Sequence, residues 1–361
     1  RAYKGVYRLI EMKARINQRP LPEVEVVDMK ECLRCGGNAM LSPSLMEALD
    51  ACLRRGEQAM LLLNRRGYTP VLRCLSCGEV LKCPHCEVAL SYHKQENCLK
   101  CHVCGYSRTL PGHCPTCGAN DWRSLGMGTQ RLEEYVQHCF PQARIVRMDA
   151  DTTRAKGAHE TLLEQFSKEA DILLGTQMIA KGLDYARVTL VGILNADAML
   201  NRGDYRCSEL TYDLLEQACG RSGRGERSGR VILQAYDCAH YAVRCAAAHD
   251  YEGFFRREMQ FRHLAQYPPY AYLSAVVLHH RNAQTVREDA LAARETLSGG
   301  AFKVLGPIEL GRLRDECRWR LILKGKDRHE QAAALRRLAQ AHRMQKRRSR
   351  LEIDVDLMML E

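Results

Sequence analysis

The sequence predicts an α/β fold in which a parallel β-sheet is covered by helices on both faces. Between residues 42 and about 245, strand-like and helix-like segments alternate along the chain. The strand-like segments are continuous apolar runs such as "AMLLL" and "VTLVGIL", which are typical of strands buried on both faces. Such strands alternating with helices favour one layered unit. A cysteine-rich segment interrupts this unit, and a change of composition near residue 250 predicts a separate, small α+β domain after it.

The layered unit is expected to begin with a helix at 44–55, because Ser42 and Pro43 favour a helix start and Gly56 favours a helix end. A buried strand is expected directly afterwards, and Thr129 can cap the first helix after the cysteine-rich segment. The strands of the unit are expected at 59–63, 143–148, 171–176, 188–194 and 230–236, and its further helices at 129–139, 158–168 and 208–219.

The region after residue 250 is predicted to fold separately. The segment "QYPPY" at 266–270 interrupts the chain, and three short strands at 273–280, 319–325 and 351–357 flank one long helix near 328–345. The predicted organisation is therefore a linker at 1–40, the α/β unit at 41–72 and 120–247, an inserted cysteine module at 73–119, and a C-terminal domain at 248–361.

Charge and cysteine usage limit the class of protein. The 361 residues include 54 Lys and Arg against 43 Asp and Glu, and the formal net charge of +11 suits a polyanionic partner such as nucleic acid without requiring one. No apolar run approaches the roughly 18 to 20 residues needed to span a bilayer, and no signal peptide pattern is present, so no membrane partner is expected. The 18 cysteines cluster as Cys-x-x-Cys, which indicates metal or redox chemistry in a reducing compartment. We expect a cytoplasmic protein and, since the chain begins at Arg1, part of a longer one.

The cysteine module contains four Cys-x-x-Cys knuckles, which predict two zinc ions because each tetrahedral site takes two knuckles. The four pairs are Cys74/Cys77, Cys83/Cys86, Cys101/Cys104 and Cys114/Cys117. Fourteen residues separate the second pair from the third, which is close to a zinc-ribbon gap, whereas only five separate the first pair from the second. The spacing therefore favours a nested arrangement, in which the two inner pairs bind one ion and the two outer pairs bind the other.

Other cysteines and histidines in or near the module are alternative metal ligands for these two sites. Cys98, Cys101 and Cys104 form a double register, of which Cys98 is expected to stay free. Gly78, Gly105 and Gly118 follow three knuckles and let the backbone turn toward the metal. Four nearby histidines are expected to be surface residues, namely His85, His93, His102 and His113. The additional pair Cys32/Cys35 has no partner pair and is expected to lie in an unoccupied loop, and redox catalysis is disfavoured because no pair opens a helix after a strand.

Two segments of the α/β unit suggest phosphate chemistry. "GTQMIAKGLD" at 175–184 follows a buried strand, and "QACGRSGRGE" at 217–226 ends a helix. In the second segment, Arg221 and Arg224 can project to one side while the adjacent glycines leave room for a ligand. Paired arginines of this kind suit the charge that develops on a transferring phosphoryl group, although a flexible basic loop or a nucleic-acid contact would have the same composition.

These two segments resemble motifs V and VI of superfamily 2 helicases. Together with "LLLNRRGY", the eight-cysteine insertion, "MGTQRLEE", "DADTTRAKGA", "QYPPY", "VLGP" and "RWRLIL", they resemble over nearly the whole chain the PriA family of bacterial replication-restart helicases, also called primosomal protein N prime. The resemblance implies a RecA-like second helicase lobe with an inserted two-zinc module and a small C-terminal domain. Neither the phosphate loop nor the acidic magnesium box of the first lobe occurs in these residues, so the chain alone is not expected to hydrolyse ATP.

The resemblance also implies roles for individual residues. Arg224 would be the arginine finger that reaches the γ-phosphate, supported by Arg221 and Gln217. Gly182, Asp184 and Gly220 would lie near the nucleotide, and Thr176, Gln177 and Lys181 near the DNA backbone. ATP and Mg²⁺ would be bound together with the first lobe, and two Zn²⁺ by the module.

The partners implied are forked, branched and single-stranded DNA, the single-stranded-DNA-binding protein, other primosome proteins and the replicative helicase loader. A basic helix start, with Lys324, Lys326 and Arg328, is the expected contact for the acidic tail of the single-stranded-DNA-binding protein. The implied function is an ATP-dependent 3′ to 5′ DNA helicase of replication restart that initiates primosome assembly. The alternative is a non-catalytic zinc-ribbon adaptor that binds DNA.

Overall fold

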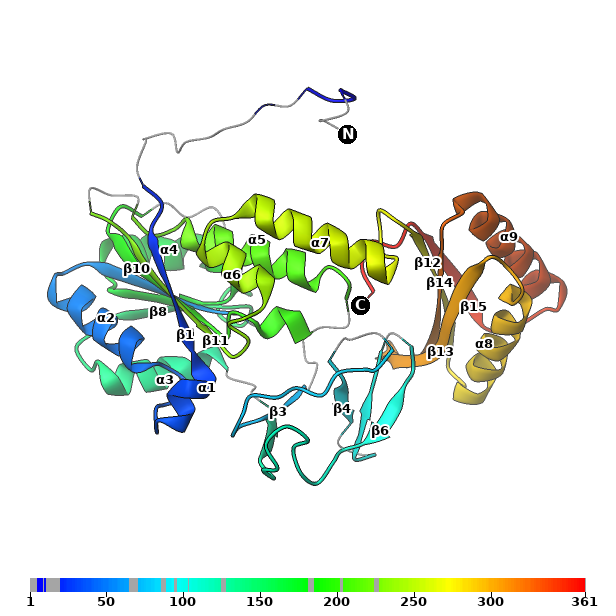
Figure 1. The fold of residues 1–361 in the computed structure, drawn as a ribbon, viewed down its shortest axis with the longest axis horizontal. Helices are drawn as coiled ribbons and strands as arrows, with labels where there is room; N and C mark the ends of the chain where they lie inside the picture. The colour runs from blue at the N-terminus through cyan, green and yellow to red at the C-terminus, as the bar shows by residue number, and fades with distance from the viewer. Residues whose placement is uncertain are drawn as a thin grey trace.

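The computed structural model describes residues 5–8, 10, 20–64, 71–85, 89–93, 96–102, 104–124, 128–180, 185–201, 204–223 and 227–360. A layered α/β lobe occupies one end of the molecule, and a second sheet with two helices forms the other end. A small cysteine-rich module lies below the middle of the molecule in this view (Figure 1). The predicted α/β fold class is confirmed.

The core of the lobe is a six-stranded sheet in which every pair of neighbours is parallel. Its order is β1 (Glu23–Asp28), β11 (Arg230–Ala235), β10 (Val188–Leu194), β2 (Gln58–Leu63), β9 (Ile172–Gly175) and β8 (Ile145–Met148). Every residue of β2, β9 and β10 is buried, which explains their continuous apolar sequences.

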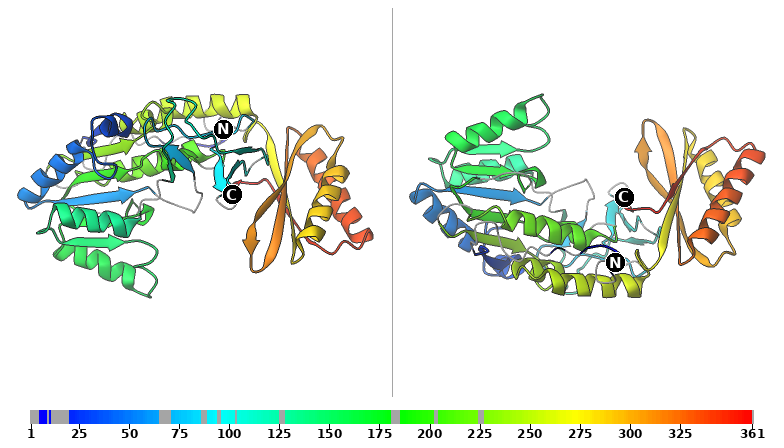
Figure 2. Two further views of the ribbon diagram at one scale, coloured as in Figure 1. Left: turned by 90° about the horizontal axis from the view of Figure 1, so that it is seen from below. Right: turned by 90° about the horizontal axis from the view of Figure 1, so that it is seen from above.

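Helices cover both faces of this sheet (Figure 2). On one face, α2 (Pro43–Arg54) and α3 (Thr129–Cys139) contribute Leu49 and Leu132 to an apolar cluster. On the other face lie α4 (Ala158–Lys168), α5 (Cys207–Cys219), α6 (Tyr241–Ala247) and α7 (Tyr251–Ala265). Two short 3-10 helices, η1 (Gln177–Ala180) and η2 (Ala198–Asn201), follow β9 and β10.

The predicted linker at 1–40 is corrected by the structure, because part of it belongs to the lobe. Residues 23–28 form the edge strand β1, which pairs with β11 from Glu23 opposite Arg230 to Asp28 opposite Ala235. The helix α1 (Met29–Arg34) follows directly. The sequence "EVEVVD" shows no continuous apolar run, because an edge strand is only half buried, and this is why the strand was not predicted.

The predicted boundary at residue 248 also requires correction, because α7 packs on the lobe. Phe254 of α7 stacks on Tyr212 of α5 with ring centroids 4.2 Å apart. The Tyr241 hydroxyl of α6 donates to Glu258 of α7 at 2.6 Å. The helix ends at Gln266, which adopts a left-handed conformation, and the C-terminal domain begins only after this point.

The cysteine module is built from small antiparallel sheets between β2 and α3. At the base of the module, β3 (Leu72–Cys74) is paired with β7 (Trp122–Ser124). The tip of the module is a second sheet of three strands, β4 (Ser91–His93), β5 (Cys98–Lys100) and β6 (Ser107–Thr109). Because the module is inserted after β2, it lies at the edge of the main sheet where the parallel strands end.

The C-terminal domain is an antiparallel sheet with two helices on one face. The strands β12 (Tyr272–His280), β13 (Phe302–Leu313), β14 (Glu316–Gly325) and β15 (Arg350–Val355) are arranged in the order β13-β14-β12-β15. The predicted single helix is corrected to two, α8 (Ala283–Leu297) and α9 (Arg328–Met344), which share one apolar cluster with the sheet. The buried stripe of α8 includes Ala290 and Ala293, and these small side chains give a weak periodic signal.

Candidate functional site

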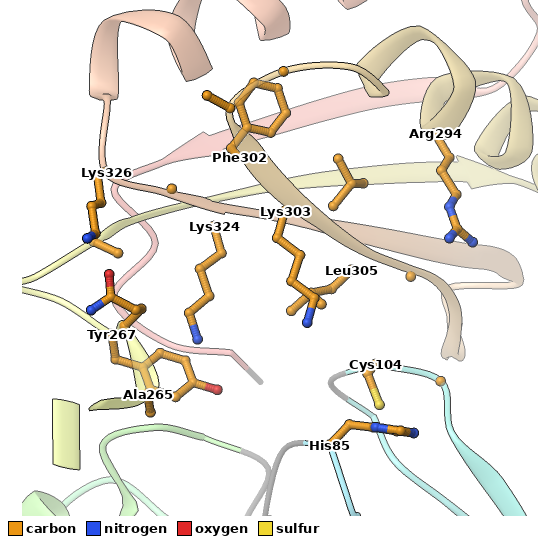
Figure 3. Close-up of a pocket in the computed structure, with 18 of the residues that line it drawn as sticks. His85, Cys104, Ala265, Tyr267, Arg294, Phe302, Lys303, Leu305, Lys324 and Lys326 are labelled. Atoms are coloured by element: carbon orange, nitrogen blue, oxygen red, sulfur yellow. The ribbon is translucent and has the colours of Figure 1, made fainter. Parts of the chain in front are cut away.

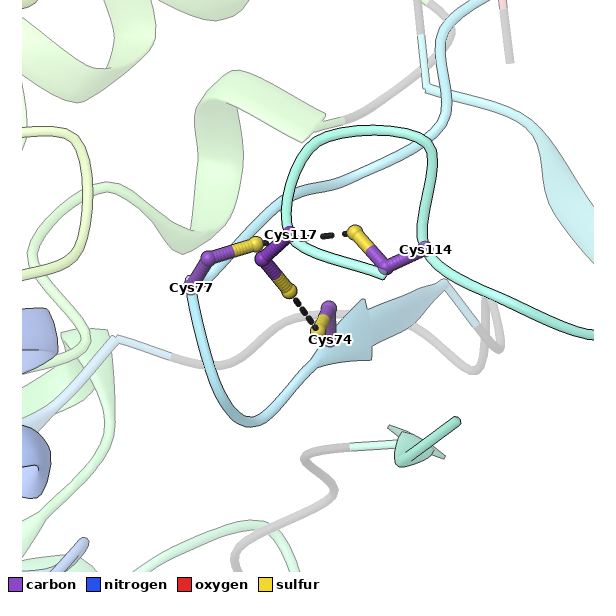
Figure 4. A group of neighbouring side chains, drawn as sticks. All are labelled: Cys74, Cys77, Cys114 and Cys117. Carbon is purple, nitrogen blue, oxygen red and sulfur yellow. Dashed lines mark hydrogen bonds between the residues drawn. The ribbon is translucent and has the colours of Figure 1, made fainter. Parts of the chain in front are cut away.

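Four cysteines of the module converge in what we call the outer group, which consists of Cys74, Cys77, Cys114 and Cys117 (Figure 4). Their sulfur atoms all lie within 4.8 Å of one another, and the Cys74–Cys117 and Cys77–Cys114 sulfurs are each 3.6 Å apart. Zinc–sulfur bonds of about 2.3 Å in a tetrahedron place two sulfurs about 3.8 Å apart. The outer group therefore fits one zinc ion.

A second cluster, which we call the inner group, contains Cys83, Cys101 and Cys104. The Cys83 and Cys104 sulfurs are 3.6 Å apart, the same separation as in the outer group. The fourth predicted ligand, Cys86, lies outside the described residues. The structure thus gathers the described cysteines in the nested arrangement that the spacing predicts, and thiolates at these separations fit a second zinc ion.

The backbone of the knuckles explains how short loops present their sulfurs. Gly78, Gly105 and Gly118 have φ angles of +74°, +81° and +74°, and their N–H groups donate to the carbonyls of Cys74, Cys101 and Cys114. A residue with a side chain adopts this left-handed conformation only with strain, so each glycine permits the tight turn. Three knuckles share one geometry for this reason.

Burial and backbone hydrogen bonds act on the thiols in opposite directions. Burial raises the pKa of the Cys77 thiol to about 12. At Cys114 burial also raises the pKa, but the backbone N–H groups of Cys117 and Thr116 outweigh it and lower the pKa to about 7. The outer group therefore contains one thiol that ionises readily and one that needs a nearby positive charge to do so.

The other cysteines and histidines near the module lie outside both groups. Cys98 donates to Glu96 and is not a member of either described group. His85 and His113 are exposed, whereas His93 and His102 are half buried with their Nε2 atoms 3.3 Å apart. The pair Cys32/Cys35 lies on and just after the short helix α1, so the predicted loop is corrected to a helix end.

The arginine and glycine segment lies at the edge where the strands of the main sheet begin. The Ser222 hydroxyl donates to the Thr189 carbonyl at 2.8 Å, and the Gly223 N–H donates to the Val188 carbonyl at 3.3 Å. Gln217 is exposed on the last turn of α5, Gly220 ends that helix, and Arg221 is half buried. Arg224 lies outside the described residues.

The segment after β9 starts at the opposite edge of the sheet. Thr176 is half buried there, and its N–H donates to the Met148 carbonyl. Gln177 is only 7% exposed, and its amide donates to Asn64 at 3.3 Å. The side chain of Gln177 is thus engaged inside the lobe, and its contact with the DNA backbone stays a prediction. Three other predicted residues of this segment lie outside the described part of the chain, namely Lys181, Gly182 and Asp184.

A buried ion pair attaches the module to the lobe. Arg73, immediately before Cys74, bonds Asp197 at 3.3 Å and stacks over the Tyr236 ring at 4.0 Å from its centroid. Asp197 also accepts hydrogen bonds from the backbone N–H groups of Tyr236 and Asp237. These contacts tie the start of the module to the ends of β10 and β11. No sequence motif predicts these contacts, because 124 positions separate Arg73 from Asp197.

The module also contacts the C-terminal domain, in a region that we call the joint. Arg320 of β14 donates to the His102 carbonyl at 2.7 Å and to the Leu360 carbonyl. Apolar residues of the module, of the lobe and of the C-terminal domain fill the joint, including Leu81, Leu90, Leu99, Tyr205, Tyr267, Leu273, Ile322 and Leu360. The same cluster contains Cys83 and Cys101, so the inner group lies beside the joint.

A pocket of about 1090 Å³ opens beside this joint (Figure 3). Lys303 and Lys324 reach into it from the C-terminal domain, facing His85 and Cys104 of the module. The Lys324 ammonium lies 3.6 Å from the centroid of the Tyr267 ring. Lys326 and Arg294 also line the pocket, whereas Arg328 pairs with Asp356 outside it.

Three known families match successive parts of this arrangement. Residues 124–226 match the helicase conserved C-terminal domain, residues 83–108 match the PriA DNA helicase Cys-rich region domain, and residues 263–358 match the primosomal protein N C-terminal domain. The fold and the site therefore define the C-terminal lobe of a helicase that carries a cysteine-rich zinc ribbon.

Curated relatives identify the family. The replication restart protein PriA of Bacillus subtilis (strain 168) is 43% identical, over 99% of this chain and 45% of its own length. Proteins of the same description from Synechocystis and Haemophilus influenzae are 40% and 34% identical, over 87% and 98% of this chain and 39% and 49% of their own lengths. The chain thus spans half or less of the length of these relatives, and it corresponds to the C-terminal portion of the PriA family of replication restart proteins.

Among solved structures, RecG bound to a three-way DNA junction aligns with 68% of this chain and with 22% of the RecG chain, at 14% identity and a TM-score of 0.35. This likeness is too distant to inform the fold. Within the described residues, no helix combines the length and the apolar character needed to cross a bilayer.

Proposed function

We propose that this chain is the second motor lobe, zinc module and C-terminal domain of an ATP-dependent 3′ to 5′ DNA helicase. The complete protein would recognise forked or branched DNA and initiate primosome assembly in replication restart. The observation that carries this proposal is the position of the two motifs within one sheet. The arginine and glycine segment is fixed at the edge where β10 begins, while Thr176 and the cysteine module lie at the edge where the strands end.

This arrangement supports a separation of the nucleotide site from the DNA site. Arg224, with Arg221 and Gln217, would face the γ-phosphate of an ATP bound with Mg²⁺ by the first lobe, and stabilise the charge of phosphoryl transfer. Gly182, Asp184 and Gly220 would line the same nucleotide. Thr176, Gln177 and Lys181 would lie toward the DNA backbone, so that a movement of the sheet would couple ATP state to strand movement.

We further propose that the outer and inner groups each bind one Zn²⁺. The sulfur separations of 3.6 Å support this assignment. The fourth ligand of the inner group would be Cys86. Zinc thiolate sites of this kind persist in a reducing compartment, which favours action in the cytoplasm.

The partners would be forked, branched and single-stranded DNA, the single-stranded-DNA-binding protein, other primosome proteins and the replicative helicase loader. The pocket with Lys303, Lys324 and Lys326 is the surface that we propose for the acidic tail of the single-stranded-DNA-binding protein. A carboxylate tail would gain charge-assisted hydrogen bonds from these ammonium groups. The pairing of Arg328 with Asp356 makes it a weaker candidate than the sequence indicated.

The test of this function is DNA-stimulated ATP hydrolysis by the full-length protein with R221A or R224A. We expect a fall of kcat by about 10³-fold, the low end of the range for an arginine finger, with fork DNA binding within twofold of the parent protein. A non-catalytic zinc-ribbon adaptor would need neither arginine. Unchanged hydrolysis in both variants would therefore favour the adaptor and reject the helicase.

A further inference from the structure

Two histidines of the module lie together outside both described cysteine groups. His93 ends β4, and His102 follows Cys101 in the Cys101/Cys104 knuckle. Their Nε2 atoms are 3.3 Å apart, and the two rings are tilted by 41° with their centroids 5.3 Å apart. Both side chains are half buried. The fold thus brings together two ring nitrogens that lie nine positions apart in sequence.

The separation of the two nitrogens matches that of two ligands on one tetrahedral ion. Zinc–nitrogen bonds of about 2.0 to 2.1 Å place two nitrogens of a tetrahedron about 3.3 to 3.4 Å apart. Neighbouring ligands of a square-planar ion with similar bonds would lie only about 2.8 to 3.0 Å apart. The distance therefore favours Zn²⁺ or tetrahedral Co²⁺ over Cu²⁺ or Ni²⁺. A hydrogen bond between the two rings gives the same distance without an ion, and it is the alternative to be excluded.

The charged groups around the pair leave one carboxylate available to a cation. Two carboxylates and two cations act on the histidines electrostatically, namely Glu96, Glu309, Lys100 and Arg320. Glu96 neutralises Lys100 through a salt bridge of 2.5 Å. Arg320 donates to the His102 carbonyl at 2.7 Å and so holds the backbone of this histidine. Glu309 of β13 forms no salt bridge with the described residues, so its charge favours a metal ion beside His93.

The ionisation of His93 suits a metal ligand. Burial, followed by the positive charge of Lys100, lowers the pKa of His93 below its ordinary value of 6.5. A neutral imidazole offers a lone pair to a metal ion, whereas a protonated one offers none. At pH 7 a metal ion therefore has no proton to displace from this ring.

We propose that His93 and His102 form a third metal site, which binds one tetrahedral divalent cation such as Zn²⁺ apart from the two cysteine groups. The ion links the end of β4 to the Cys101/Cys104 knuckle, and water completes its coordination. This proposal is independent of the proposed helicase activity. Because two imidazoles replace four thiolates, the ion leaves on dialysis while the cysteine groups keep theirs.

Calorimetric titration of the dialysed 361-residue chain with Zn²⁺ alone measures the site. We expect the parent chain, which already holds the ions of its cysteine groups, to take up one further Zn²⁺. H93Q and H102Q should each weaken this binding at least about tenfold, because each removes one of two protein ligands. The double variant should bind no worse than either single variant, since one remaining imidazole no longer forms the site. E309Q should weaken binding by a smaller factor, because Glu309 acts only through its charge.

The matched control is H113Q. His113 also neighbours a knuckle cysteine, Cys114, but it is exposed and its Nδ1 lies 3.2 Å from the Gly118 carbonyl oxygen of its own knuckle. We expect its affinity for the further Zn²⁺ to stay within twofold of the parent value. Elemental analysis after dialysis should still find two zinc ions in H93Q and H102Q, which would show that the module remains folded.

Co²⁺ gives a readout in the parent chain that needs no variant. A tetrahedral Co²⁺ ion with nitrogen and oxygen ligands absorbs visible light, and thiolate ligands add a charge-transfer band in the near ultraviolet. An octahedral ion on a surface histidine absorbs far more weakly. One equivalent of Co²⁺ added to the zinc-loaded chain should therefore give the visible band without the thiolate band.

The outcomes decide between a metal site and the alternatives. One further ion that depends on His93 and His102 but not on His113 supports the proposal. Absence of a further ion in the parent chain would mean that the rings share only a hydrogen bond, and it would overturn the site. A thiolate band with added Co²⁺, or equal losses in H93Q and H113Q, would also reject it. If H93Q and H102Q lose their zinc on dialysis, the Co²⁺ spectrum of the parent chain decides alone.

Discussion

At the scale of single residues, the cysteine register can be tested by counting metal. Cys101 is in the inner group and Cys98, three residues earlier, is not. We expect C101S to bind one Zn²⁺ fewer than the parent chain, because the site loses a thiolate ligand, and C98S to keep the parent value of two. The measurement is zinc content by elemental analysis after dialysis. Loss of one ion from C98S, with C101S unaffected, would show that the register is shifted.

Glu57, immediately before β2, predicts a dependence of stability on pH. Hydrogen bonds from Arg55, Thr189 and Arg227 lower the pKa of its carboxyl from 4.5 to about 2 in the folded chain. Its stabilisation is therefore present above about pH 4.5 and is lost as the pH falls toward 2. We expect E57Q to lower the free energy of unfolding by about 1 to 2 kcal/mol at pH 7, since one of its partners is largely exposed.

The measurement for Glu57 is urea unfolding of both proteins at pH 7 and at successively lower pH values. The difference between the parent chain and E57Q should shrink below about pH 4.5. Loss of zinc at low pH affects both proteins, and the comparison between them removes it. A difference in the free energy of unfolding that stays constant down to pH 3 would contradict a stabilising, ionised Glu57 carboxylate.

At the scale of elements, α7 offers a matched pair of aromatic residues. Phe254 is buried against Tyr212, whereas its neighbour Phe255 is 45% exposed. We expect F254A to cost about 3 to 5 kcal/mol because it removes a packed ring from the core, and F255A to cost within about 0.5 kcal/mol. Urea unfolding followed by circular dichroism measures both. Equal effects would mean that α7 does not pack on the lobe as described.

The elements differ in how far the sequence could predict them. The strands β2, β9 and β10 are buried along their whole length, and their continuous apolar runs identified them. β1 was not predicted because it lacks a continuous apolar run, although its alternation of glutamate and valine is typical of a half-buried strand. α8 was not predicted because the alanines of its buried face give a weak periodic signal. The helix α7 was assigned to the wrong domain, since only the packing of Phe254 on Tyr212 shows to which core it belongs.

Candidate functional residues were also predictable only where their pattern lies within one short segment of the sequence. The knuckle cysteines were predictable because their chemistry depends on short spacing within one segment, and a similar short spacing marks the arginine and glycine segment as a hypothesis. The contacts that hold them were not, since Arg227 meets Glu57 across 170 positions and Arg73 meets Asp197 across 124. Such pairs form only when the sheet brings strand ends together, and a single sequence carries no sign of them.

At the scale of the whole molecule, the inner group is predicted to hold the joint together. Its cysteines belong to the apolar cluster that the lobe, the module and the C-terminal domain share, whereas the apolar side chains that pack on the outer group, among the residues described, are Ala119 and Trp122 of the module. We therefore expect C101S to loosen the C-terminal domain and C117S to leave it docked.

Limited proteolysis measures this difference. The connection at 266–271 should be cut at least about fivefold faster in C101S than in the parent chain, and at the parent rate in C117S, because cleavage follows local opening. Small-angle scattering should show a larger radius of gyration for C101S alone. Equal protection of the connection in both variants would mean that the inner group does not support the joint.

We propose above that this chain is the second lobe of an ATP-driven motor that moves 3′ to 5′ on DNA. The most direct measurement is strand displacement by the full-length protein on two partial duplexes, one with a 3′ single-stranded tail and one with a 5′ tail. We expect ATP-dependent separation of the duplex with the 3′ tail, and loss of this activity in R224A. Displacement that proceeds without ATP, that prefers the 5′ tail or that survives in R224A would contradict it.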